Sequence, residues 1–187
     1  MSPVALAKGG GDDLSLRSSE GAKGEPISFL KHMFENAFLN ALAIFGARDL
    51  IFVMAVVVMA SFFVLPKQKQ KQMILFAAFL FPVAYLAAKL GSLLFFNARP
   101  FAVGGFDPLL PHDADNGFPS DHSLLAAAFV AVALPYKKWG GMILAILAFF
   151  VGISRVYVGV HHPIDILASF LIVAVVAPLV FKAIRST

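Results

Sequence analysis

The residues best suited to chemistry lie in one twelve-residue stretch of a mostly apolar chain. The sequence SRVYVGVHHPID, residues 154–165, combines an arginine, two histidines and an aspartate. Arg155 offers a planar guanidinium that matches phosphate oxygens. His161 can move protons or act as a nucleophile near neutral pH. Asp165 follows His161 by four residues, about one helical turn, so its carboxylate can hold one imidazole nitrogen and leave the other free.

Two further polar clusters interrupt the apolar sequence. The stretch NARPF contributes Arg99, a second guanidinium. The stretch GFPSDHS is typical of a helix start, with Ser120 or Asp121 as the N-cap, and the free N–H groups and dipole of such a helix end favour an anion. His122, in the same stretch, is a second candidate for proton transfer. The three clusters together predict a phosphate site with acid–base and nucleophilic groups.

The composition indicates what kind of protein must position these clusters. The chain has 187 residues, is 59% hydrophobic and 14% charged, and has a mean hydropathy of +0.83. These values exclude an ordinary soluble domain and predict an integral membrane protein. The sequence contains no cysteine, which excludes disulfides and thiolate metal sites. Its net charge of +4 comes from dispersed bases without a basic stripe of interleaved aromatics, so we expect no nucleic-acid partner.

The N-terminal part of the chain differs from the rest. Residues 1–26 are rich in Gly, Ser and mixed charge, which predicts a disordered tail, and they contain no apolar core of a cleavable signal peptide. Apolar residues recur at intervals of three and four over residues 27–45, which predicts an amphipathic helix lying in the membrane interface. The alternative is a sixth crossing over residues 27–48, which would bury several charged and amide side chains. Residues 27–187 are predicted to form one membrane domain.

The apolar runs predict an all-α fold, a polytopic transmembrane helical bundle with about five spans. Pro66, Pro135 and Pro163 mark the ends of runs. The third run has about 16 residues and reaches roughly 24 Å, less than the roughly 30 Å of a hydrocarbon core, so we expect its outer end to be recessed. The predicted crossings are residues 49–65, 73–96, 120–135, 141–159 and 163–181.

The distribution of charge predicts the orientation of the bundle. Seven bases and no acid fall in three of the connections: Lys67, Lys69, Lys71, Lys137, Lys138, Lys182 and Arg185. The long loop over residues 97–119 instead carries three aspartates and one arginine. The positive-inside rule therefore places the lysine-rich connections in the cytoplasm. The long loop and residues 154–165 are then both outside, on the same face of the membrane.

These clusters resemble the three-part signature of the type 2 phosphatidic acid phosphatase (PAP2) superfamily, which reads K-x6-R-P, then P-S-G-H, then S-R-x5-H-x3-D. The matches to the first two parts are Arg99-Pro100 and Pro119, Ser120 and His122, and the third part is matched completely by Ser154, Arg155, His161 and Asp165. The resemblance covers roughly residues 30 to 182. Within the superfamily, RPF, FPSDH and the upstream LLPH resemble the bacterial undecaprenyl diphosphate phosphatases of the bacitracin-resistance type.

The sequence departs from the signature at two positions. Asp121 stands where glycine is usual, and Ser92 stands where the first part has lysine. Lys89 lies ten residues before Arg99 on a different helical face, so we leave open whether it approaches the substrate.

The resemblance implies a role for each matched residue. His161 would attack the terminal phosphorus and form a phosphohistidine, while Asp165 orients it. His122 would protonate the leaving lipid phosphate and then activate water. The equatorial oxygens would be held by Arg99, Arg155, Ser120 and backbone N–H groups near Asp121 and His122. This scheme requires no metal or other cofactor, because preorganised donors replace the Mg²⁺ of many phosphoryl-transfer sites.

Other polar residues are expected to have structural or solvent roles. His162 has no position in the signature, so we favour a structural role. The group His112, Asp113 and Asp115 could bind a divalent ion, but we favour solvated loop residues.

The sequence therefore predicts a lipid phosphatase of the bacterial inner membrane that removes one phosphate from undecaprenyl diphosphate at the outer face and binds the lipid tail between spans. Alternatives are a phosphatase for phosphatidic acid, phosphatidylglycerol phosphate or a lipid A phosphate, and a catalytically silent lipid-binding or transport protein. Vanadium haloperoxidases share the motifs, but they are soluble, and the apolar runs argue against that class.

Overall fold

The computed structural model describes residues 36–185. The predicted tail over residues 1–26 and the first part of the predicted amphipathic helix lie outside this range, so both stay predictions. The described elements are α3 (Ala37–Ile44), the π-helical turn η1 (Phe45–Asp49), α4 (Leu50–Phe63), α5 (Lys67–Leu94), α6 (Pro100–Gly104), α7 (Asp121–Ala133), α8 (Lys138–Tyr157) and α9 (Pro163–Arg185). The described part of the chain contains no β-strand, only an isolated bridge between Ala98 and Asn116. The all-α prediction is confirmed.

Within residues 36–185, four helical segments are long and apolar enough to cross a membrane: Ala37–Phe63, α5, α8 and α9. The remaining apolar helix, α7, has 13 residues. At 1.5 Å per residue it extends roughly 20 Å, which is less than the roughly 30 Å of a hydrocarbon core. Each of the five predicted crossings corresponds to an observed helix. The third, α7, is shorter than predicted, with 13 residues in place of about 16.

The start of the first crossing differs from the prediction. Residues 37–49 continue into α4 without a loop, because a π-helical turn over Phe45–Asp49 keeps the backbone helical. The helical segment therefore includes twelve residues before the predicted start at residue 49. Residues 37–48 do not form a separate sixth crossing, since a crossing of their own would need a reversal of the chain before α4.

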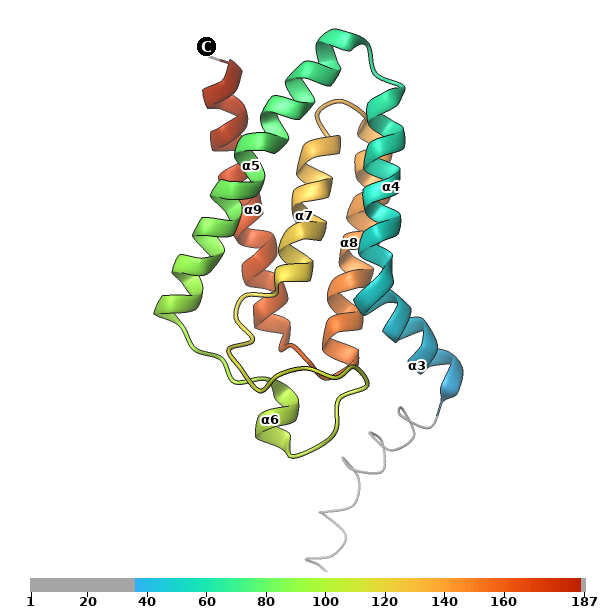
Figure 1. The fold of residues 1–187 in the computed structure, drawn as a ribbon, viewed down its shortest axis with the longest axis vertical. Coiled ribbons are helices and arrows are strands. Elements are labelled where there is room, and N and C mark those ends of the chain that lie inside the picture. Colours follow the sequence, from blue (N-terminus) through green and yellow to red (C-terminus); the bar gives the residue numbers. More distant parts are fainter. Residues whose placement is uncertain (1–35, 186–187) are drawn as a thin grey trace, which may run out of the picture. The chain divides into compact units, whose positions relative to one another are not determined.

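Helix α7 lies at the centre of the bundle and packs against α4, α5, α8 and α9 (Figure 1). Its small residues, such as Ala126 and Ala128, are fully buried and let the neighbouring helices approach closely. On one side α7 meets Phe76 of α5 and Val173 of α9, and on the other it meets the core that contains Met54 of α4 and Leu144 and Val151 of α8.

Large apolar side chains cover the outer faces of the helices. Phe52, Leu86, Ile146 and Leu171 are all mostly exposed. An apolar surface of this extent is typical of a protein that faces lipid.

The alternating direction of the helices brings the three polar clusters to one end of the bundle. Helices α5 and α8 end there and α7 and α9 begin there, next to the loop that contains α6 (Figure 1). The lysine-rich connections between α4 and α5 and between α7 and α8 lie at the opposite end. The clusters therefore converge at one end of the bundle, as predicted, while the face of the membrane to which this end belongs stays a prediction.

Candidate active site

A tight turn after α8 places His161. Gly159 adopts a φ of +83°, a left-handed conformation that side chains disfavour. A Cβ at this position would also lie 2.7 Å from the Phe106 ring. The turn is closed by the Val160 N–H, which donates to the carbonyl of Arg155. It returns the chain over the end of α8, so that the side chains of Arg155 and His161 meet.

The two ring nitrogens of His161 lie in different surroundings. Nδ1 is 3.4 Å from Oδ2 of Asp165, whereas Nε2 is 3.4 Å from Nη1 of Arg99 and 3.3 Å from Nη2 of Arg155. The carboxylate assigns the proton to Nδ1, which leaves the Nε2 lone pair between the two guanidiniums. Burial lowers the pKa of His161, and the nearby positive charges of Arg155 and Arg99 add to this effect, although the bond to Asp165 opposes it. The imidazole is thus kept neutral with one nitrogen available for attack.

Asp165 is held from two further directions. Its side chain is fully buried, Oδ1 accepts a 2.7 Å hydrogen bond from Nδ2 of Asn97, and Oδ2 accepts a 2.8 Å bond from the backbone N–H of His162. These bonds fix the carboxylate that orients His161. His162 itself bonds through Nε2 to the carbonyl of Ala98, so its side chain contacts the loop.

Arg99 is buried and reaches the site from the loop after α5. Its Nε donates to Oδ1 of Asp115 at 2.7 Å, and Nη1 donates to the carbonyl of Val160 at 2.9 Å. Asp115 is mostly exposed. Burial would raise the pKa of Asp115, but the bond and charge of Arg99 outweigh it and lower that pKa. The bonds to Asp115 and Val160 set the plane of the Arg99 guanidinium.

Arg155 is also buried, and its guanidinium contacts the π-helical turn η1 and the loop between α6 and α7. Nη1 donates to the carbonyl of Ala47 in the π-helical turn at 3.4 Å, and Nη2 lies 3.3 Å from Nε2 of His112. Nε of Arg155 is buried without a hydrogen-bond partner among the described residues. A buried donor of this kind is costly unless a ligand satisfies it.

The start of α7 supplies the remaining groups. Ser120 is the N-cap, and its Oγ accepts a 3.4 Å hydrogen bond from the N–H of Ser123. The first N–H groups of a helix have no intrahelical acceptor, so those of Asp121 and His122 are available to an anion. The side chains of Asp121 and His122 line the adjoining cavity.

A cavity of about 440 Å³ connects these groups. Its polar lining includes Lys89, Arg99, His112, Asp121, His122, Arg155 and His161. Five of the seven predicted site residues thus border one space, and Asp165 lies behind His161. The seventh, Ser120, does not border it: its side chain is fully buried, because its hydroxyl turns to the helix start. Ser120 is the N-cap, as its place at the helix start predicted, and its contact with phosphate stays a prediction.

Several residues of the site were missed by sequence reasoning. His112 was expected in a solvated loop. Its side chain is exposed on one side but also borders the cavity, where partial desolvation and the charges of Arg99 and Arg155 lower its pKa. Asn97 and Asn116 have no position in the signature. The only sequence signal for His112 was its place in LLPH, and nothing marked the two asparagines. Between residues 36 and 185 no group of three or more histidines and carboxylates is arranged to hold a metal ion.

Asn116 anchors the loop to the end of α5. Its Nδ2 donates to both the carbonyl and the Oγ of Ser92, at 3.0 and 3.1 Å, while its Oδ1 accepts from the N–H of Asn97. Ser92, at the position where the signature has lysine, is therefore a structural contact.

Gly117 allows the loop to approach the site. A Cβ there would lie 3.3 Å from Cγ of Arg99 and from Oδ2 of Asp165, tighter than ordinary contact. Only a glycine leaves both side chains undisturbed.

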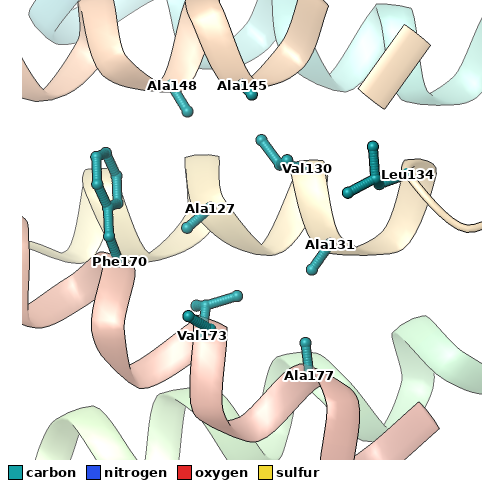
Figure 2. A pocket seen from close by; sticks show the side chains of 10 residues that line it. Ala127, Val130, Ala131, Leu134, Ala145, Ala148, Phe170, Val173 and Ala177 are labelled. Atoms are coloured by element: carbon teal, nitrogen blue, oxygen red, sulfur yellow. The ribbon is translucent and has the colours of Figure 1, made fainter. Parts of the chain in front are cut away.

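A second cavity of about 330 Å³ lies between α7, α8 and α9. Its labelled side chains, among them Val130, Phe170 and Val173, are all apolar (Figure 2). Without a titratable or hydrogen-bonding side chain, this space offers no groups for phosphoryl transfer.

Comparisons with known proteins identify the family of the chain. The sequence pattern of the PAP2 superfamily matches residues 83–186. The chain is 32% identical to the bacitracin transport permease protein BcrC of Bacillus licheniformis, over 79% of this chain and 72% of that protein. It is 30% identical to the undecaprenyl-diphosphatase BcrC of Bacillus subtilis, over 79% and 76%.

A solved structure has a similar fold. It is that of a transmembrane PAP2-type phosphatidylglycerolphosphate phosphatase from Bacillus subtilis, with a TM-score of 0.57 and 25% identity over 93% of this chain and 88% of that one. The chain therefore belongs to the PAP2 superfamily and is a multi-pass membrane phosphatase.

Proposed function

We propose that this phosphatase hydrolyses undecaprenyl diphosphate to undecaprenyl phosphate and inorganic phosphate, through a phosphohistidine at His161. The observation that carries the proposal is the position of His161 Nε2 within 3.4 Å of both Arg99 and Arg155 at the edge of one cavity. The choice of lipid is supported by the similarity to the undecaprenyl-diphosphatase BcrC.

In the first step, Nε2 of His161 forms a bond to the terminal phosphorus. The bond from that phosphorus to the bridging oxygen breaks, and His122 gives its proton to this oxygen as undecaprenyl phosphate leaves. Arg99, Arg155 and the N–H groups at the start of α7 bind the three equatorial oxygens, whose charge they stabilise in the transition state. Asp165 stabilises the cationic imidazole that forms.

In the second step, water attacks the phosphorus of the phosphohistidine. His122, now neutral, takes the proton from water, and the N–P bond breaks with its electrons returning to Nε2 of His161. Inorganic phosphate leaves, and both histidines return to their starting states.

The proposed location is the bacterial cytoplasmic membrane, with the site at its outer face. Support comes from the lysine-rich connections, which lie at the end of the bundle opposite to the site. In this orientation the enzyme would return the lipid carrier to cell-wall synthesis and would contribute to bacitracin resistance.

A phosphate-release assay with undecaprenyl diphosphate tests the proposed function. Purified protein in detergent is incubated with undecaprenyl diphosphate, and phosphate release is measured for the wild type and for His161→Ala. We expect turnover by the wild type and a loss of at least about 10³-fold in the variant, the scale seen when a nucleophile is removed. Comparable turnover by His161→Ala would exclude His161 as the nucleophile.

A second candidate substrate class is another lipid phosphate. It is favoured by the similarity to the phosphatidylglycerolphosphate phosphatase structure. The same assay is repeated with phosphatidic acid, phosphatidylglycerol phosphate and a lipid A phosphate. The lipid with the highest kcat/KM identifies which of the two substrate classes the enzyme prefers. Binding of all these lipids without phosphate release would instead favour a silent lipid-binding protein.

A further inference from the structure

A third cation borders the cavity apart from the two arginines that face His161. Lys89 lies on α5, and its side chain is 49% exposed. Its Nζ lies 4.0 Å from Oδ2 of Asp121 and 5.1 Å from the centroid of the Tyr85 ring. The ammonium thus lies at the rim beside a carboxylate and an aromatic face.

The rim is where a polar space meets an apolar one. Asp121 and Tyr85 also border a cavity of about 320 Å³ between α5 and α7, whose other lining residues are Phe81, Ala84, Leu124, Leu125 and Ala128. Asp121 is common to this apolar cavity and to the polar cavity with His161. Lys89 contacts Asp121 and Tyr85, so it stands at the junction of the two.

The terminal phosphate, inner phosphate and apolar tail of a lipid diphosphate follow one another in the same order as the polar cavity, the junction and the apolar cavity. The terminal phosphorus must reach Nε2 of His161, and the apolar tail fits the cavity between α5 and α7. The phosphate next to the tail then lies at the junction, beside Lys89. With a lipid monophosphate the single phosphorus must be at His161, so the junction receives only the ester linkage.

The polar cavity has room for this arrangement. Water occupies about 30 Å³ in the liquid, so 440 Å³ corresponds to roughly fifteen water volumes, well above the size of one phosphate. A compact ammonium with three rotatable donors also suits a phosphate that must be held but not distorted.

We propose that Lys89 binds the tail-proximal phosphate and makes the enzyme prefer lipid diphosphates over lipid monophosphates. Asp121 is a positioning residue, which holds the ammonium at the junction until the phosphate arrives. This inference rests on the proposed phosphatase function.

The test compares Lys89→Met with two substrates that share a tail, farnesyl diphosphate and farnesyl monophosphate. We expect kcat/KM for the diphosphate to fall about 10- to 100-fold, mainly through KM, because a hydrogen bond to a charged group is worth about 1.5–3 kcal/mol. For the monophosphate we expect a change of less than about threefold. Lys89→Arg keeps the charge and should retain most of the preference.

The matched control is Lys71→Met. Lys71 is an exposed lysine near the opposite end of α5, and its replacement should leave kcat/KM unchanged for both substrates. Thermal unfolding in detergent checks that both variants are folded. Equal losses on the two substrates, or no loss on the diphosphate, would overturn the role of Lys89. A wild type that releases phosphate from neither farnesyl substrate nor from undecaprenyl diphosphate would instead refute the proposed function, and the inference with it.

A double-mutant cycle tests the role of Asp121. Asp121→Asn should change KM for the diphosphate in the presence of Lys89 and should have no such effect in the Lys89→Met background. Equal effects in both backgrounds would show that Asp121 acts independently of Lys89.

Discussion

His161 performs two tasks at once because its two nitrogens are separated by environment. Asp165 holds Nδ1, and that carboxylate is fixed in turn by Asn97 and the backbone of His162. Nε2 is left between two buried guanidiniums. Burial disfavours a charged His161 imidazole, and the two guanidiniums, which we propose bind phosphate, add to this lowering of its pKa.

The pH dependence follows from this arrangement. Burial and the two arginines lower the pKa of His161 from its ordinary value of 6.5, so the imidazole stays neutral as the pH falls through 6.5. The acid limb of kcat/KM, which reports free enzyme, should therefore lie below pH 6.5.

The acid limb of kcat/KM could come from titration of His161 or of the substrate, and the variant Asp165→Asn distinguishes the two causes. The bond to Asp165 opposes the lowering of the pKa of His161, so its loss should move the limb to still lower pH. The residual activity of the variant is measured over the same pH range. A limb above pH 6.5 in the wild type, or one that does not move in the variant, would contradict the assignment.

Asn97 is predicted to act through Asp165. Asn97→Ala removes a 2.7 Å bond to the buried carboxylate, worth about 1.5–3 kcal/mol, so kcat should fall about 10- to 100-fold while KM changes little. Steady-state kinetics check this, with Gln72→Ala, an exposed residue near the far end of α5, as the control. A rise in KM at constant kcat would mean that Asn97 binds substrate directly.

At the scale of the elements, the site is assembled by helix ends and by the short turns that join them. The turn at Gly159 brings His161 over Arg155, and Gly117 lets the long loop pass within contact distance of Asp165 and Arg99. The π-helical turn before α4 supplies the Ala47 carbonyl to Arg155.

Gly159→Ala tests the importance of that turn. The left-handed conformation costs a side chain about 1–2 kcal/mol, and the new Cβ would also overlap Phe106, so stability and kcat should both fall. Gly105 is a matched control, because its φ is +63° but a Cβ there would meet nothing within 4 Å. Thermal unfolding and activity assays should show a larger loss for Gly159→Ala than for Gly105→Ala. Equal losses of stability and activity in the two variants would show that overlap with Phe106 adds no cost at Gly159.

The sequence predicted the elements better than the turns between them. Apolar runs bounded by Pro66, Pro135 and Pro163 indicated the long apolar helices of residues 36–185, since burial in lipid imposes length and composition. The start of the first span was wrong because a π-helical turn leaves no mark in apolar periodicity.

Among the site residues, the motif positions could be predicted because their chemistry is distinctive. Asn97, Asn116 and His112 could not, since their partners come from distant parts of the chain and depend on the path of the long loop. Ser120 could be predicted as the N-cap of α7 because Ser is a preferred residue at a helix start.

At the scale of the whole molecule, successive long helices of residues 36–185 run in alternating directions and bring the candidate reactive groups to one end of the bundle. The shortest, α7, is central and contacts the other four, so its polar start lies among the ends of its neighbours. In the proposed function, a lipid phosphate would enter from the membrane and its reacting phosphorus would meet groups at these helix ends.

The orientation can be tested because the sequence contains no cysteine. Asp113→Cys places an exposed thiol at the end with the site, and Gln68→Cys places one at the opposite end. In intact bacterial cells, a membrane-impermeant maleimide should label the first variant, and it should label the second only after permeabilisation. The reverse pattern would place the site in the cytoplasm.

The central claim is that His161 forms a covalent bond to phosphorus. Its most direct test is a rapid quench of the enzyme with undecaprenyl diphosphate carrying ³²P in the terminal phosphate, followed by peptide mapping under alkaline conditions. The account predicts acid-labile label on the peptide containing His161, and none in His161→Ala. Substrate turnover by the wild type without label on that peptide, or with label on another residue, would contradict it.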